Sequence, residues 1–197
     1  MVKCSVFIAT SLDGFISRKD GTIDWLNEAG DRSPEGEDYG YAHFMVDIDA
    51  LVMGRSTFEQ VLTFGEWPYG SKPVVVLSST LKNLPAHLPP TVSLSAEEPL
   101  RLVQRLSSAG FHHLYIDGGQ TIQGFLAAGL INEITITVIP VLLGSGRPLF
   151  GMLASDVQLD LICSRAFKSG FVQSHYRVLS PLIPSAAGAE YHPEGDR

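Results

Sequence analysis

The chain has 197 residues, and 45% of them are hydrophobic, which is enough for one domain with a full core. Its formal net charge of −7 excludes a general nucleic-acid binder, because phosphate contacts require a basic surface. No window approaches the roughly 18 consecutive apolar residues that cross a bilayer, and no signal-peptide pattern precedes the first strand, so we expect a cytoplasmic protein with no membrane partner.

The first half of the chain begins with an apolar, β-rich segment at residues 2–9, which predicts a strand buried on both faces of a sheet. Turn and loop composition follows over 10–36, with Trp25 as an apolar anchor. Aromatic and apolar residues then recur at helical spacing and predict a helix over 37–47. Asp38 lies at the start of this predicted helix.

Strands and helices alternate through the middle of the chain. The predicted strands are 50–53, 73–78, 113–116 and 133–139, and the predicted helices are 56–62, 100–109 and 118–129. Prolines between residues 80 and 92 forbid a long helix there. The alternation predicts an α/β fold with a mainly parallel sheet and right-handed crossovers.

After Pro140 the pattern changes to two strand-like runs, 157–168 and 171–179, which predict an antiparallel hairpin at the sheet edge. We expect apolar side chains of this hairpin to pair two copies of the chain as a homodimer. One domain is expected over 1–181. The segment 182–197 has no periodic apolar pattern, and we expect it to be a disordered tail.

The two cysteines, Cys4 and Cys163, both lie in apolar strand-like segments, and we predict that they are reduced core residues. Neither has a cysteine or histidine at metal-ligand spacing. We therefore expect no metal site.

Two of the predicted strands end in glycine at the point where a helix begins. The junctions read Gly54-Arg55-Ser56-Thr57 and Gly118-Gly119-Gln120-Thr121. Glycine lets a ligand approach the backbone closely, and the free N–H groups of the following helix form an anion site. Two such junctions favour a dinucleotide with separated phosphates, and so an enzyme that uses one as a cofactor, a reductase.

Each hydroxyl at these strand ends also has a purely structural interpretation. Ser56 is a candidate helix cap, with Glu59 completing a capping box, whereas Arg55 favours a phosphate clamp. Ser78 and Ser79, at the end of strand 73–78, either cap a helix or bind a cofactor phosphate.

Several short motifs, taken in their order along the chain, carry a family resemblance. Phe7-Ile8-Ala9, Asp24-Trp25-Leu26, Met53 to Glu59, Leu77-Ser78-Ser79 and Ile116-Asp117-Gly118-Gly119 resemble dihydrofolate reductase. Ser11 to Ile16 and Pro140 to Gly146 are more similar to the C-terminal reductase domain of the bifunctional riboflavin-biosynthesis deaminase-reductase. The resemblance spans roughly residues 2–180. It implies a stand-alone domain with the dihydrofolate reductase-like three-layer fold.

The same resemblance implies NADPH as the cofactor and a set of residues that hold it. Ala9 would line the nicotinamide pocket, and Ser78 and Ser79 would lie at the adenosine 2′-phosphate. Gly118, Gly119, Gln120 and Thr121 would cradle a phosphate, often through a cis Gly-Gly peptide in the family. Gly54, Arg55, Ser56 and Thr57 would bind the pyrophosphate and the adenosine phosphate side.

The catalytic residues leave alternatives open. By resemblance Asp38 would supply the proton, although a carboxylate there also complements the helix N-terminus. Asp13 is a second candidate acid, or a turn residue. Trp25 would cover the nicotinamide or pack as a loop anchor. Thr137 would bind the substrate or the acid, although β-propensity alone explains it.

The implied reaction is hydride transfer to a pterin-like or pyrimidine-like small molecule, as in 5-amino-6-(5-phosphoribosylamino)uracil reductase. Residues 35–45 lack the basic side chains that would bind a ribose phosphate, which argues against that particular substrate. The alternatives are dihydrofolate reduction and a non-catalytic, dimeric nucleotide-binding module.

Overall fold

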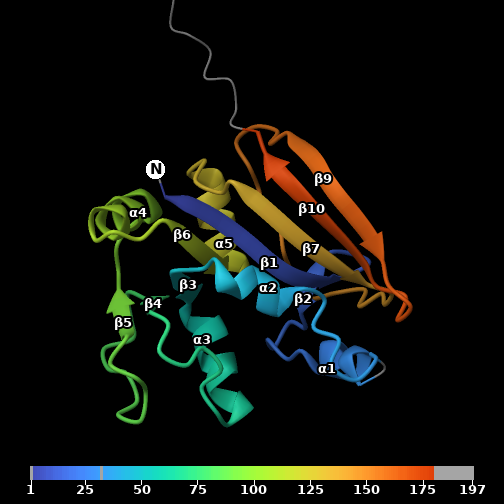
Figure 1. Cartoon of the computed structure of the whole chain (residues 1–197), viewed down its shortest axis with the longest axis horizontal. Helices are drawn as coiled ribbons and strands as arrows, with labels where there is room; N and C mark the ends of the chain where they lie inside the picture. The colour runs from blue at the N-terminus through green and yellow to red at the C-terminus, as the bar shows by residue number, and fades with distance from the viewer. Residues whose placement is uncertain (1, 32, 180–197) are drawn as a thin grey trace, which may run out of the picture.

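The computed structural model describes residues 2–31 and 33–179. Its main sheet has the strand order β5-β4-β3-β6-β1-β7-β10-β9 (Figure 1). The strands are β1 (Lys3–Ser11), β3 (Ala50–Gly54), β4 (Val74–Leu77), β5 (Val92–Ser95), β6 (His113–Asp117), β7 (Glu133–Ile139), β9 (Leu159–Ala166) and β10 (Val172–Val178). β10 is antiparallel to both β7 and β9, and the other neighbouring strands are parallel. The predicted α/β fold, a mainly parallel sheet with an antiparallel C-terminal hairpin, is confirmed.

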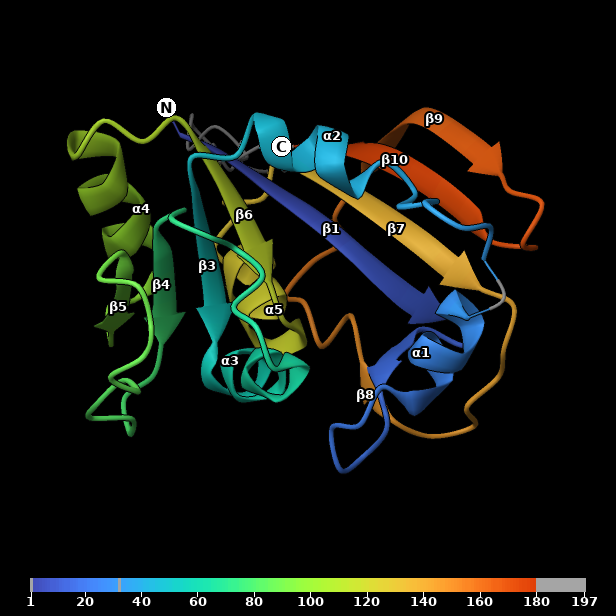
Figure 2. The ribbon, with the colours of Figure 1, turned by 60° about the horizontal axis from the view of Figure 1, so that its bottom comes forward.

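Helices cover both faces of the parallel part of the sheet, which gives three layers (Figure 2). On one face α4 (Pro99–Ser108) and α5 (Gly119–Ala127) contribute Leu102 and Phe125 to a cluster with strand residues such as Ile116. On the other face α2 (Tyr41–Val46) and α3 (Arg55–Val61) pack over a second cluster around Met53 and Phe58. The apolar strand runs are therefore buried on both faces, as parallel strands require.

The parallel register brings several strand ends to the same edge of the sheet. Met53 lies opposite Asp117, and Gly54 lies opposite Leu77. The turns into α3 and α5 and the turn after β4 therefore meet at one edge. In open α/β sheets this carboxyl edge is where ligands bind.

The region between β1 and β3 differs from the sequence prediction. The expected loop contains the helix α1 (Asp24–Gly30), which buries Trp25 against Ile139 and Phe171. The helix expected over 37–47 is shorter, because Tyr39 and Gly40 have φ angles of 56° and 84° and form a turn before α2.

Four short elements were not predicted. β5 adds an edge strand of four residues. β2 (Phe15–Ser17) and β8 (Arg147–Pro148) pair as an antiparallel ribbon apart from the main sheet, and η1 (Leu62–Phe64) extends α3 by one turn. Elements this short carry too few residues for a periodic signal.

Two further expectations concern single segments. Cys4 is buried as predicted, but Cys163 is exposed, because neither face of β9 is covered by another element. The predicted tail, 182–197, lies outside the described residues. Within the described ranges, none of the helices has the length and apolar character needed to cross a membrane.

Candidate active site

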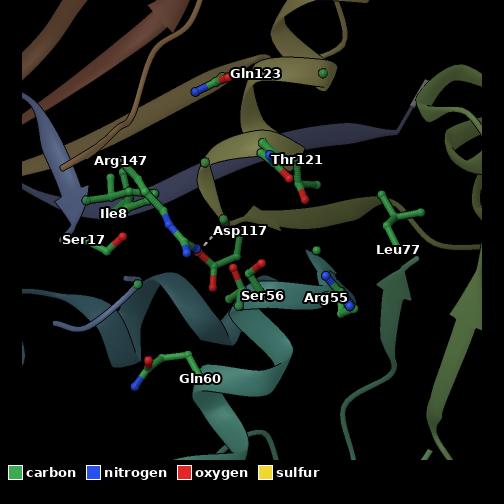
Figure 3. A pocket seen from close by; sticks show the side chains of 18 of the residues that line it. Ile8, Ser17, Arg55, Ser56, Gln60, Leu77, Asp117, Thr121, Gln123 and Arg147 are labelled. Atoms are coloured by element: carbon green, nitrogen blue, oxygen red, sulfur yellow. Dashed lines mark hydrogen bonds between the residues drawn. The ribbon is translucent and has the colours of Figure 1, made fainter. Parts of the chain in front are cut away.

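A cleft of about 1170 Å³ opens at the carboxyl edge of the sheet (Figure 3). Its walls come from the end of β1, the starts of α3 and α5, the turns after β4 and β5, and the β2–β8 ribbon. All of the residues predicted to bind the cofactor line this one cleft: Ala9, Gly54, Arg55, Ser56, Thr57, Ser78, Ser79, Gly118, Gly119, Gln120 and Thr121. The fold thus brings together residues from four separate stretches of the chain.

The two glycine junctions pack against each other within this cleft. A Cβ atom on Gly54 would lie 2.8 Å from the Thr121 hydroxyl, and one on Gly118 would overlap the Thr57 hydroxyl. Gly118 also has a φ angle of 90°, which favours glycine. Packing between the junctions is therefore a sufficient reason for both glycines, whether or not a ligand approaches them.

The helix N-termini at these junctions are free of side-chain caps. Neither α3 nor α5 has a side-chain hydrogen bond to its first N–H groups. The capping-box alternative at Ser56 is therefore not realised, since α3 begins at Arg55. Glu59 instead lies with a carboxylate oxygen 3.8 Å from the Arg55 Nε one turn earlier. The uncapped N–H groups of α5 border the cleft and are available to an anion.

The backbone at Gly118-Gly119 differs from the family expectation, because the described chain contains no cis peptide bond and this one is trans. The β2–β8 ribbon lies directly against this turn. A Cβ on Gly119 would be 2.8 Å from Ile16 Cδ1 and 3.4 Å from the Pro148 carbonyl oxygen. The ribbon thus forms a wall over the start of α5.

The turns after β4 and β5 form the other end of the cleft. The Ser78 hydroxyl oxygen accepts hydrogen bonds from the N–H groups of Leu81 (2.9 Å) and Thr80 (3.2 Å). Ser79 is exposed at the same turn. At the next turn Glu97 is paired with Arg105, 2.7 Å apart. Ser78 therefore fastens its own turn, and its hydroxyl also lies 3.4 Å from the Thr80 hydroxyl.

Asp117 is a cleft residue that the sequence analysis did not single out. It is half-buried at the end of β6, and its Oδ1 accepts a hydrogen bond of 2.8 Å from the Gly118 N–H. Burial raises the pKa of Asp117 to about 6, although the Gly118 hydrogen bond opposes this rise. Burial, followed by the charge of Asp117, also raises the pKa of Tyr69, another cleft residue. The only signal in the sequence was the position of Asp117 directly before the glycine pair.

The predicted catalytic residues do not line the cleft. Asp38 is exposed, and its carboxylate accepts hydrogen bonds of 2.8 Å from the N–H groups of Gly40 and Ala42, which lower its pKa. Trp25 is buried with Ile139 and Phe171, as in the anchor interpretation.

The other two candidates also have structural partners. Thr137 is buried, and its hydroxyl accepts a hydrogen bond of 2.9 Å from the Gln173 side chain. Asp13 accepts hydrogen bonds from Ser11, Leu143 and Gly144, so it ties two loops together as a turn residue. In the described ranges no three histidine, cysteine or carboxylate side chains are grouped so that they could hold a metal ion.

Comparison with known proteins gives a consistent family. The model of the RibD C-terminal domain matches residues 3–173. The uncharacterised protein YwjB of Bacillus subtilis (strain 168) is 36% identical over 177 residues, covering 88% of this chain and 97% of that protein. The uncharacterised protein YyaP of the same organism is 29% identical over 178 residues, covering 86% of this chain and 91% of that protein.

Solved structures with the same fold are also known. A Shewanella sp. PV-4 protein described as a riboflavin biosynthesis protein has a TM-score of 0.85 and 42% identity, covering 90% of this chain and 99% of that one. RibD of Acinetobacter baumannii has a TM-score of 0.67 at 18% identity, covering 91% of this chain but 58% of that one. At that identity the second likeness establishes the fold alone.

Proposed function

Because the chain belongs to the RibD C-terminal domain family, we propose that it is a reductase that uses NADPH to reduce a pyrimidine-like or pterin-like small molecule. The observation that carries this proposal is one continuous cleft, which joins the uncapped N-terminus of α5 to Arg55 and to the turn after β4. A dinucleotide has separated anionic groups that suit such a cleft.

The donors in the cleft fit the anionic groups of the cofactor. N–H groups at the start of α5 would bind one phosphate, together with Gln120 and Thr121. The exposed Arg55 guanidinium would bind a second phosphate as a two-pronged donor. Ser78 and Ser79 would lie at the adenosine end, and Ala9 at the nicotinamide end. The protein as a whole is acidic, yet these donor groups line one cavity. This local gathering of donors supports the binding of an anionic cofactor there.

The proton for the reduction would come from Asp117. Bound NADPH would supply a hydride, and the reduced carbon–nitrogen or carbon–oxygen bond then needs a proton from a nearby acid. A pKa of about 6 leaves a useful protonated fraction of Asp117 near neutral pH. Asp38 instead has a lowered pKa, because it accepts hydrogen bonds from Gly40 and Ala42, and it lies outside the cleft. We therefore assign the acid to Asp117.

Nucleotide titration tests this function. We expect the wild-type protein to bind NADPH, and Arg55→Gln to weaken this binding about tenfold, because one charge-assisted phosphate contact is lost. Arg101→Gln, on the exposed side of α4, is the matched control and should bind as the wild type does. Absence of NADPH binding at millimolar concentration would refute the proposal. Consumption of NADPH with a pyrimidine substrate, but not with dihydrofolate, would separate this function from dihydrofolate reduction and from a non-catalytic module.

We also propose that the protein is a homodimer that pairs through β9. This edge strand is exposed along its whole length and carries the exposed apolar side chains of Leu159, Leu161 and Ile162. An uncovered apolar edge strand readily pairs with another chain. A second copy of the same hairpin is the partner that closes such an edge symmetrically.

A further inference from the structure

Arg147 is a cleft residue that the proposed function leaves without a role. It belongs to β8, where it lies opposite Ser17 of β2, and its Nε donates a hydrogen bond of 3.2 Å to the Lys19 carbonyl oxygen. The side chain is thus anchored to the ribbon by one of its donors.

The guanidinium group is held a second time, by packing on Gly21. A Cβ atom on Gly21 would lie 3.3 Å from the Cζ atom and from both terminal nitrogen atoms of Arg147. Equal distances to these three atoms mean that the planar group lies face-on against the backbone at Gly21. Because Gly21 also has a φ angle of 98°, a side chain is disfavoured there, and the space for the guanidinium is maintained.

The two terminal amino groups of Arg147 have no protein acceptor in the described part of the chain. No hydrogen bond or ion pair to a carboxylate involves them there, whereas nearby Arg18 is bound two-pronged by Asp24 at 2.7 and 2.8 Å. In Figure 3 the Arg147 side chain points into the cleft from the side of Ile8 and Ser17. Arg147 therefore presents an oriented, unpaired fork of donors to the cavity.

We propose that Arg147 binds an oxyanion, a phosphate or a carboxylate, carried by the molecule that is reduced. This inference rests on the proposed NADPH function. The cofactor's own phosphates already have donors in the N–H groups of the α5 N-terminus and in Arg55. Figure 3 places Arg55 on the opposite side of the cleft from Arg147, while the ribbon that carries Arg147 lies against the start of α5. A planar fork with free terminal donors matches the two oxygens of a carboxylate or phosphate. The protein would thus select anionic substrates through Arg147 of the β2–β8 ribbon. Residues 35–45, which lack basic side chains, would not take part in this selection.

The test measures anion binding to the protein saturated with NADPH. Ribose 5-phosphate is the phosphate probe, glutamate the carboxylate probe, and uncharged ribose the blank. We expect one of the two anions to bind, and Arg147→Gln to weaken it about tenfold or more while leaving NADPH affinity within about twofold. Arg147→Lys retains the charge without the fork and should fall between them. Arg18→Gln is the control, because Arg18 is already occupied by Asp24. Thermal melting checks that each variant is folded.

Three outcomes would overturn the assignment while leaving the proposed function intact. The first is that the NADPH-loaded wild type binds neither anion. The second is that Arg147→Gln and the wild type bind the anion equally well. The third is that Arg147→Gln loses NADPH affinity, which would mean that Arg147 binds a phosphate of the cofactor. A wild-type protein that fails to bind NADPH would instead refute the proposed function itself.

Discussion

At the scale of single residues, the cleft contains the carboxyl group of Asp117 and the basic side chains of Arg55 and Arg147, which do not form ion pairs with it. Asp117 is half-buried beside Tyr69, and no basic side chain in the described ranges forms an ion pair with it. Its ionised form is therefore poorly solvated and lacks a charge partner, which is the physical cause of its raised pKa. A carboxyl group with a pKa of about 6 keeps a minor protonated fraction near neutral pH, which is useful in catalysis, but its ionisation costs stability.

Asp117→Asn tests this cost directly. The pKa is about 6 in the folded protein and 3.8 for the model group, so the folded state holds the proton more tightly, and stability is lost as pH rises from 4 through 6. Asparagine does not ionise, so the variant does not lose this stability. Its free energy of unfolding, relative to that of the wild type, should therefore rise by roughly 2–3 kcal/mol between pH 4 and pH 8.

Urea unfolding at the two pH values measures the change. Asp38→Asn is the control with the opposite sign, because hydrogen bonds lower the pKa of Asp38 and its ionised form stabilises the protein above its unfolded pKa. A pH-independent difference between Asp117→Asn and the wild type would show that Asp117 is not perturbed.

At the scale of elements, two strand-to-helix junctions form the centre of the cleft by interlocking. The β3–α3 junction contributes Gly54 and Thr57, and the β6–α5 junction contributes Gly118 and Thr121. Each threonine occupies the space that the other junction's glycine leaves open. The spacing of the two helix N-termini is therefore set by contact between them.

Gly54→Ala tests this interlock. Gly54 has an ordinary φ of −79°, so the variant is strained only by the Thr121 hydroxyl, 2.8 Å from the new Cβ. We expect a loss of about 1–3 kcal/mol in the free energy of unfolding, and a smaller loss when Thr121→Ala is already present. The double-mutant cycle, measured by denaturant unfolding, gives the coupling. Gly30→Ala is the control, since nothing lies within 4 Å of its Cβ. Additive effects of Gly54→Ala and Thr121→Ala would contradict the interlock.

At the scale of the whole molecule, the two long edges of the main sheet differ. One edge is β5, which has four residues, two of them buried. The other is β9, which has eight residues, all exposed. A long exposed edge with apolar side chains is a liability for a monomer, and this asymmetry is the basis for the proposed dimer.

Leu161→Lys should therefore convert the dimer into a monomer, because it places a charge in the centre of the paired edge. Leu161 is 58% exposed in the single chain, so the substitution should not disturb the folded monomer. Leu100→Lys, at a residue 53% exposed on α4, is the matched control and should leave the dimer intact. Sedimentation velocity measures both variants. A monomeric wild type, or a dimer unaffected by Leu161→Lys, would contradict the proposal.

The sequence by itself determined the alternating order of strands and helices and the C-terminal hairpin. It also identified the residues of the two glycine junctions, which line the cleft. These features rest on local signals, namely apolar periodicity and glycine between a strand and a helix, which neighbouring residues along the chain carry. It did not determine α1, the β2–β8 ribbon or the exposure of Cys163, because packing between distant segments decides them.

Only the tertiary structure decided which acid and which cation face the cleft. The sequence pointed to Asp38 and Asp13 as acids and offered no reason to choose Asp117. In the structure Asp38 accepts hydrogen bonds in the turn before α2, while the register of β6 against β3 places Asp117 at the carboxyl edge. Arg147 likewise reaches the cleft only because β8 pairs with β2, more than a hundred residues away in sequence. Burial, solvation and donor orientation depend on what surrounds a side chain in space, and the order of residues does not specify those surroundings locally.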